Sequence, residues 1–124
     1  DMKIYHVTEA GRAELHTWLT TPQPERDDRE PFLIQVYFGG QVSDAELLKV
    51  MKHKLKETEE RLAVYEVVHQ MIQNTPQKIN DPRAIFLSVL TLEAGYVNNQ
   101  SIATWLRSAI ERIEKKRYKI KIGK

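Results

Sequence analysis

Glutamate and histidine are the residue types in this chain best suited to chemistry, and one pair of them has a functional spacing. Glu66 and His69 form a Glu-x-x-His pattern, which places both side chains on one face of a helix. Di-iron bundle proteins use two such pairs together with two further glutamates, and this sequence contains no second pair. The other histidines are His6, His16 and His53, and they show no metal-ligand spacing. We therefore predict no metal site and interpret His69 as a polar residue at a helix seam.

Other kinds of catalytic site are also absent from the sequence pattern. The chain has no cysteine, which excludes a cysteine nucleophile, a thiolate metal site and a disulfide. It has no glycine-rich phosphate loop and no nucleophile elbow, and Gly39-Gly40 is interpreted as a simple turn. The sequence predicts a protein that is not an enzyme, with no catalytic residue and no cofactor.

The composition indicates one helical, water-soluble domain. The chain has 124 residues, of which 41% are hydrophobic and 29% are charged. Its net charge of +2 is too small to argue for nucleic-acid binding by itself. No apolar run approaches the ~18 residues of a membrane span, so no membrane partner is expected. Because Asp1 is not a natural start, we expect a fragment or a processed form.

The stretch from Ser43 to about residue 75 is the element that must organise the others. Ser43 and Glu46 form a capping box, and no glycine or proline follows up to Gln73. A helix of about 30 residues is roughly 45 Å long, which is too long to be covered fully by so small a chain. Its heptad-spaced stripe therefore predicts the seam of a homodimer. The seam comprises Leu48, Met51, Leu55, Thr58, Leu62, Tyr65, His69 and Ile72.

A second apolar stripe on the same stretch indicates contacts on two sides, one with the chain's own helices and one with a partner. This stripe comprises Leu47, Val50, Val64, Val68 and Met71. Charged residues flank the seam, among them Lys52, Glu59 and Glu66. Exposed ion pairs contribute little, so the charges leave both parallel and antiparallel pairing open.

Two shorter helices are predicted before the long one. Thr8 is an N-cap candidate for a helix that ends near Pro22. Residues 30–38 form a second helix that is apolar on almost every side, which predicts burial from several directions. Three aromatic side chains from these helices are candidates either for an effector pocket or for core packing: Trp18, Phe32 and Tyr37.

One or two helices are predicted after the long one. A helix is predicted to start at residues 80–82, Asn-Asp-Pro, and to end at Gly95, and Asn98, Asn99 or Ser101 caps a fifth helix. The fold class is therefore all-α, with four to five helices built on one long coiled-coil-like helix.

An alternating pattern at residues 3–7 indicates a short strand before these helices. A lone strand needs a pairing partner, and the only other alternating run is at residues 118–122, which could be helix or strand. We favour the interpretation that the strand's partner lay upstream. The predicted organisation is a strand remnant at residues 1–7 and a helical dimerisation and regulatory domain at residues 8–124.

Two motifs resemble PadR-like transcriptional regulators. Residues 5–19, YHVTEAGRAELHTWL, are similar to the junction at which the second wing strand of a winged helix-turn-helix domain continues into the C-terminal domain. This chain has Val7 where the family usually has leucine. Residues 29–39, REPFLIQVYFG, are similar to the family's helix ahead of the long helix. The helical layout as far as Trp105 covers the remainder. The chain resembles the C-terminal domain of the branch related to virulence activators.

This resemblance implies a bacterial, cytoplasmic protein that dimerises through its C-terminal helices and binds palindromic operators through winged domains. Some members release DNA when they bind a small, often aromatic, effector. No recognition helix precedes Lys3, so we expect operator DNA to be bound through a missing N-terminal domain and by no residue of this fragment. The predicted function is dimerisation and effector response in a PadR-like regulator. The alternative is a stand-alone helical module that binds a ligand or partner and is unrelated to DNA.

Overall fold

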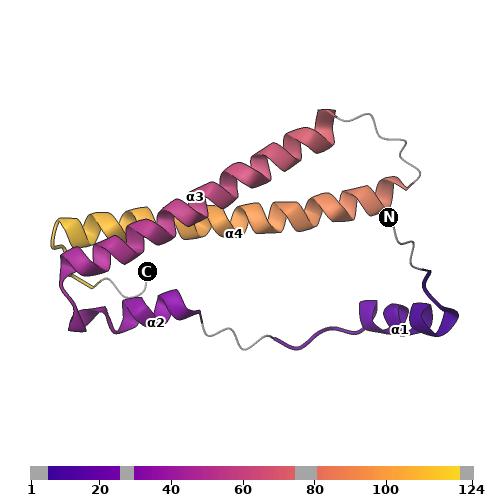
Figure 1. Ribbon diagram of the computed structural model, residues 1–124, viewed down its shortest axis with the longest axis horizontal. Helices are drawn as coiled ribbons and strands as arrows, with labels where there is room; N and C mark the ends of the chain where they lie inside the picture. The colour runs from indigo at the N-terminus through magenta and orange to yellow at the C-terminus, as the bar shows by residue number, and fades with distance from the viewer. Residues whose placement is uncertain (1–5, 26–29, 75–80, 121–124) are drawn as a thin grey trace, which may run out of the picture. The chain divides into compact units, whose positions relative to one another are not determined.

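The structure is a computed structural model, and it describes residues 6–25, 30–74 and 81–120. These residues contain no strand, which confirms the all-helical class for the part of the chain described (Figure 1). The elements are α1 (Glu9–Leu19), α2 (Pro31–Tyr37), the 3₁₀ helix η1 (Gly39–Gln41), α3 (Asp44–Asn74) and α4 (Pro82–Glu114). The chain forms two compact units, Asp1–Glu30 and Pro31–Lys124.

Helix α1 is the helix of the first unit, and its N-terminus is as predicted. The Oγ1 atom of Thr8 accepts a hydrogen bond from the backbone N–H of Gly11 at 3.0 Å. None of its residues is buried, and its apolar side chains, including Trp18, are at least half exposed. The predicted strand remnant is not supported, because His6 and Val7 are in no strand and residues 3–5 lie outside the described residues. A strand needs a partner for its backbone groups.

Helix α2 and η1 begin the second unit, and their burial differs from the prediction. Phe32 is the buried residue of α2, whereas Tyr37 is 82% exposed. The helix is therefore covered on one side rather than on every side. Gly39 is buried in η1, and a Cβ atom there would lie 2.9 Å from a methyl carbon of Leu47. The turn into α3 thus depends on a glycine that lets the backbone approach a side chain closely.

The predicted capping box at the start of α3 is confirmed. The backbone N–H of Glu46 donates to Oγ of Ser43 at 3.1 Å, and the backbone N–H of Ser43 donates to the Glu46 carboxylate at 3.1 Å. The hydrogen bonds from the Ser43 backbone and side chain lower the pKa of Glu46 below its ordinary value of 4.5. Helix α3 then continues without interruption for 31 residues.

Helix α4 is one helix of 33 residues, so the fifth helix predicted from Gly95 onwards does not exist. It starts where predicted, and its N-cap is Asp81, whose side chain accepts a 3.1 Å hydrogen bond from the backbone N–H of Ala84. Asn99 lies inside the helix, where its side-chain amide donates to the carbonyl oxygen of Gly95 at 2.7 Å. A glycine in a helix interior costs only about 1 kcal/mol, which packing against α3 can offset.

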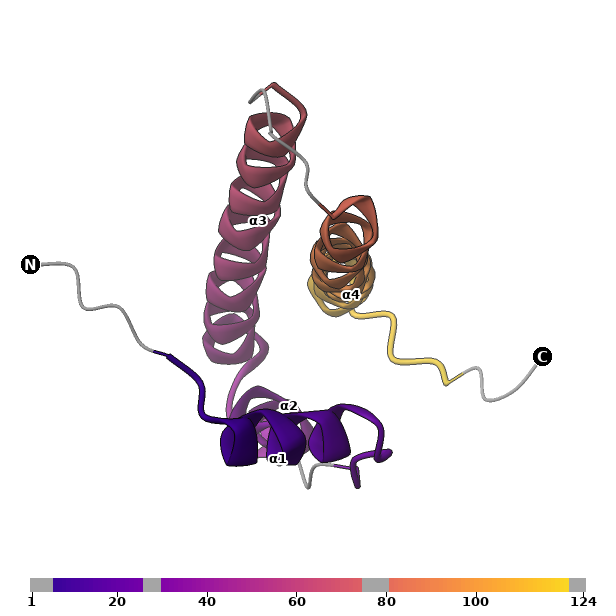
Figure 2. The same ribbon diagram turned by 90° about the vertical axis from the view of Figure 1, so that its right-hand side faces the viewer.

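Helices α3 and α4 run side by side in opposite directions and enclose the core of the second unit (Figures 1 and 2). The core cluster consists of Phe32, Met51, Leu106, Ala109 and Ile110. Every core residue from α4 belongs to its C-terminal part, which packs beside the N-terminal part of α3. The core therefore occupies only one end of the helix pair.

The end of α4 is a Schellman motif, in which the backbone N–H of Arg117 donates to the carbonyl of Arg112 at 2.8 Å. Lys116 has the left-handed conformation that this motif requires, with φ 51°. Beyond it, the Tyr118 hydroxyl donates to the carboxylate of Asp44, which raises the pKa of Tyr118. Residues 118–120 are neither helix nor strand, and residues 121 and 122 lie outside the described residues.

None of the helices in the described parts of the chain is both long enough and apolar enough to cross a membrane.

Candidate functional site

The predicted dimer seam lies largely on the side of α3 that faces α4 of the same chain. Met51 and Thr58 are each only 1% exposed. The Thr58 hydroxyl is satisfied locally by the carbonyl of Lys54 at 2.8 Å. His69 is exposed, and the remaining members are half-buried: Leu48, Leu55, Leu62, Tyr65 and Ile72. The expectation that this stripe lacks cover within its own chain is wrong for Met51 and Thr58, because the uninterrupted α4 runs along it. Pairing of the stripe with a second copy stays a prediction.

The charges beside the stripe also pair within the chain. Lys52 lies 3.3 Å from a carboxylate oxygen of Glu114, and Arg107 lies 3.4 Å from one of Glu59. All four side chains are about half exposed, so each pair contributes at most about 1 kcal/mol. Their effect is to favour the register of α3 against α4.

A close contact between α3 and α4 explains the glycine in the middle of α4. A Cβ atom at Gly95 would lie 2.5 Å from the hydroxyl oxygen of Tyr65 and 2.8 Å from its Cζ. The tyrosine ring therefore occupies the space that any other side chain at this position would need. Tyr65, which was predicted to face a second copy, lies against its own chain.

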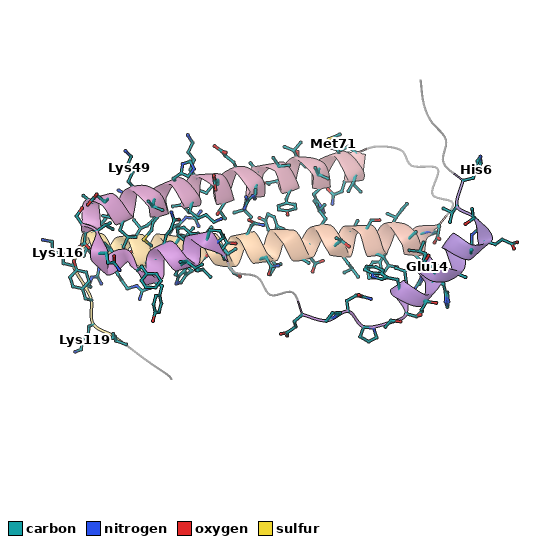
Figure 3. All side chains as sticks on the ribbon, turned by 60° about the horizontal axis from the view of Figure 1, so that its bottom comes forward. His6, Glu14, Lys49, Met71, Lys116 and Lys119 are labelled. Atoms are coloured by element: carbon teal, nitrogen blue, oxygen red, sulfur yellow. The ribbon has the colours of Figure 1, made fainter. Side chains whose placement is uncertain are left out.

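The α3–α4 pair has two unequal ends. We call residues 44–58 and 103–114 the packed end, since they contain every buried residue of the two helices. We call residues 59–74 and 82–102 the open end, where no side chain is buried. The helices diverge towards the open end (Figure 1). Lys49 and Met71, one at each end of α3, both point away from α4 (Figure 3).

A cavity of about 260 Å³ lies between the helices at the open end. Its lining contains aromatic, aliphatic and acidic side chains, namely Tyr65, Glu66, His69, Val89, Leu92, Glu93 and Tyr96. The residues from α4 have the spacing of one helix face. Sequence analysis did not bring these residues together, because the helix was expected to end at Gly95, which would have separated Tyr96 from Val89 and Leu92. A helix continued through Gly95 would have placed them together.

Glu66 and His69 both line this cavity, but the structure gives them no metal partners. Among the residues described, no group of three or more histidine, cysteine, aspartate or glutamate side chains could hold a metal ion. The side-chain nitrogen of Gln73 lies 3.0 Å from Nε2 of His69.

The three aromatic residues predicted for an effector pocket have different environments. Phe32 is 7% exposed and packs edge-to-face against Trp105, with 6.4 Å between the ring centroids. Tyr37 is largely exposed and contacts the ring of Phe38. Trp18 belongs to the other compact unit and is 58% exposed. Phe32 is thus a core residue, and a pocket formed by the three remains a prediction.

The long helix pair and the short helix before it lie within the part of the chain that matches a known family. Residues 29–114 match the family described as virulence activator alpha C-term, and the chain belongs to this family. The predicted resemblance to the C-terminal domain of PadR-like regulators is confirmed.

Individual relatives are also similar along most of the chain. The chain is 23% identical over 116 residues to the negative transcriptional regulator PadR of Bacillus subtilis, covering 93% of this chain and 64% of that protein. The PadR-like transcriptional regulator BC1756 from Bacillus cereus has a TM-score of 0.71 and 22% identity, covering 89% of this chain and 62% of that one. The structure of B. subtilis PadR with p-coumaric acid has a TM-score of 0.71 and 23% identity, covering 86% and 62%. At these identities the structural likeness establishes the fold, and the chain spans less than two thirds of each relative.

Proposed function

We propose that this chain is the dimerisation and effector-response domain of a PadR-like, DNA-binding transcriptional regulator in the bacterial cytoplasm. The family match over residues 29–114 is the observation that carries the proposal. The B. subtilis relative is a negative transcriptional regulator, and its structures include complexes with operator DNA and with p-coumaric acid. Because this chain spans 58–64% of those proteins, we assign operator reading to a segment outside these 124 residues.

The exposed apolar surface of the helix pair supports dimerisation. Two helices side by side form a single layer, and one layer cannot enclose a core on both of its faces (Figure 2). The open end accordingly exposes many large apolar side chains, each 40–62% accessible, namely Val64, Val67, Met71, Phe86, Leu87, Leu90, Val97 and Ile102. An apolar surface of this kind typically marks a protein–protein contact. A second copy of the hairpin is the partner that we propose.

The half-buried members of the predicted seam fit this arrangement. Leu62 lines an open groove together with Tyr96, Ala103 and Trp105. It therefore contacts its own chain on one side and is accessible on the other. In the proposed dimer, side chains of the second copy cover this groove and the outer part of the seam at Tyr65, His69 and Ile72.

Effector response requires two arrangements of the dimer with different affinities for the effector. The open end suits such a change because it has few buried contacts to break. A ligand that favours one separation of α3 and α4 would shift the angle between the two copies, and thereby the spacing of the DNA-reading segments.

The oligomeric state of the chain tests the first part of the proposal. Light scattering at tens of micromolar is expected to give twice the chain mass of 14.5 kDa. A monomer at this concentration would contradict dimerisation through these helices.

DNA titration tests the assignment of operator reading. We expect no sequence-specific duplex binding by this chain, because its net charge is only +2 and groove reading requires a positioned recognition element. Tight, sequence-specific binding by these 124 residues at physiological salt would contradict the assignment.

The cavity at the open end favours a second candidate, a stand-alone ligand-binding module unrelated to DNA. The two candidates differ in one measurement on the intact parent protein. A bound ligand changes operator affinity if the chain is a regulatory domain, and no operator is bound if it is a stand-alone module.

A further inference from the structure

We propose that the cavity between α3 and α4 binds a small organic cation that carries an alkylammonium group and a single aromatic ring. The inference rests on the proposed effector-response function and names the chemical class of the effector. It is carried by the apolar lining, by two carboxylates and by the size of the cavity.

The apolar part of the lining fits a single ring. Val89 and Leu92 are half-buried on one face of α4, and the half-buried rings of Tyr65 and Tyr96 come from opposite helices. A volume of about 260 Å³ lies near the lower limit for ligand pockets in proteins, roughly 300 Å³. The space therefore suits a one-ring molecule rather than a polycyclic one.

The charge of the lining selects a cation. Glu66 on α3 and Glu93 on α4 both line the cavity, which is lined by no lysine or arginine. Among the described residues neither carboxylate has a recorded ion pair, whereas the nearby Glu59 is paired with Arg107. Two exposed glutamates that line one cavity favour a cation over an anion there. Tyrosine rings add to this preference, because the face of an aromatic ring attracts an ammonium group.

The predicted selectivity differs from that suggested by the B. subtilis relative. PadR of that organism has been solved with p-coumaric acid, which carries a carboxyl group. An anionic aromatic acid in this cavity would be repelled by the negative charges of Glu66 and Glu93. We therefore expect this cavity to discriminate against an aromatic acid of that kind.

Calorimetric titration of the 124-residue chain with three matched probes tests the proposal. The probes are 2-phenylethylamine, which is protonated at neutral pH, the neutral 2-phenylethanol and the anionic p-coumarate. We expect the amine to bind at least about tenfold more tightly than the other two, a difference of about 1.4 kcal/mol. Equal affinity for the three probes, or no binding of the amine, would overturn the proposal.

Variants locate the binding. The double variant Glu66→Gln, Glu93→Gln is expected to lose about tenfold in affinity for the amine and to leave binding of the alcohol unchanged. Glu60→Gln is the matched control, because Glu60 is an exposed glutamate of α3 outside the cavity. Leu92→Trp, checked for retained helix content by circular dichroism, should abolish binding of both probes by filling the cavity. Unchanged amine affinity in the double glutamine variant would refute the site.

A side chain of the second copy is the rival occupant of the cavity. Intermolecular nuclear Overhauser effects from the partner to the methyl groups of Val89 and Leu92, which line the cavity but not the groove at Leu62, would overturn the proposal if the amine left them undiminished. The proposed function has separate tests: it would be refuted if the chain were monomeric or if the intact parent protein bound no operator. A chain that dimerises but does not bind the amine would refute the proposed ligand class and leave the proposed function standing.

Discussion

The packed and open ends of the α3–α4 pair are built from the same two helices, but they differ in what surrounds them. At the packed end, Phe32 of α2 packs beside Met51 of α3 and Leu106 of α4. Met51 and Leu106 are almost completely shielded from solvent. The open end receives no third element from the described residues of its unit, and none of its side chains is buried. A third element therefore decides which part of a helical hairpin becomes core.

This difference assigns separate tasks to the two ends. A well-packed interior resists change, since its side chains interlock at high density. A region with few buried contacts can open or rearrange at low cost, and binding surfaces commonly lie in such regions. We infer that the packed end holds the fold together, while the open end forms the contacts with a partner and a ligand.

Leu62→Asp at the open end is expected to have the largest effect. In the proposed dimer the new carboxylate would be desolvated in both copies, at a cost of several kcal/mol per ion. Dimerisation should weaken by roughly a thousandfold, which corresponds to about 4 kcal/mol. In the intact regulator, operator binding should fall to the weak binding of one half-site, because two half-sites are read through the symmetry of the dimer.

Sedimentation and operator titration of wild type and variant measure these effects. Ala63→Asp, at the exposed neighbouring position, is the matched control and should remain dimeric. A folded Leu62→Asp variant that stays dimeric would show that the interface does not include the groove at Leu62.

Leu106→Ala tests whether the packed end carries the stability. Leu106 is fully buried, and truncation of such a leucine typically costs about 3 kcal/mol. Leu90→Ala at the open end is the comparison, since Leu90 is 40% exposed in the single chain, and it should cost less than about 1 kcal/mol when both variants are unfolded from the monomer at low concentration. Urea denaturation at one fixed protein concentration compares the two, because dimerisation makes stability depend on concentration. Equal costs would show that the two ends are equally packed.

The Gly95→Ala substitution tests the close contact between Gly95 and Tyr65 at the open end. Alanine should gain about 1 kcal/mol of helix stability over glycine, but its Cβ atom would collide with the Tyr65 hydroxyl. We expect no gain in the wild-type background and a gain of about 1 kcal/mol in the Tyr65→Ala background. A double-mutant cycle by thermal denaturation measures this coupling. The same effect in both backgrounds would mean that the tyrosine ring does not restrict position 95.

Ser43→Ala is expected to have the smallest effect, a loss of about 1 kcal/mol from the N-cap of α3. The partner carboxylate adds a pH dependence, because hydrogen bonds from Ser43 lower the pKa of Glu46 below 4.5. A lowered pKa in the folded state means that this contribution is present above about pH 4.5 and is lost as the pH falls through the lowered value. Melting temperatures of wild type and Glu46→Gln should therefore differ at pH 7 and converge near about pH 3. A constant difference would assign the effect to packing.

The helix starts could be read from the sequence because each depends on neighbouring residues. Thr8, Ser43 and Asp81 each accept a hydrogen bond from the backbone N–H three residues later. The caps at Thr8 and Ser43 were predicted, and so was the start of α4 at residues 80–82. The turn at Gly39 was recognised for the same reason. Such patterns are complete within one turn of chain and do not depend on what packs around them.

The interior of α4 could not be read in the same way. Gly95 and Asn99 have the local preferences of a helix end and a helix start. In the structure, Gly95 instead leaves room for the ring of Tyr65, and the side chain of Asn99 forms a hydrogen bond within the helix. Once the predicted break was removed, α4 became long enough to cover the seam of α3 that had been assigned to a second copy.

The sequence by itself determined the all-helical class, the starts of α1, α3 and α4, the uninterrupted α3 and the family to which the chain belongs. These follow from hydrogen bonds and side-chain periodicity over a few residues, and from motifs of consecutive residues. Only the tertiary structure decided which side of α3 meets α4, which leucines are core and where a cavity remains. Those outcomes depend on contacts between residues such as Tyr65 and Gly95, which lie far apart in the chain. The free energy of such contacts exceeds the local preference of a single glycine, so packing determines the helix length and the helix length determines the site.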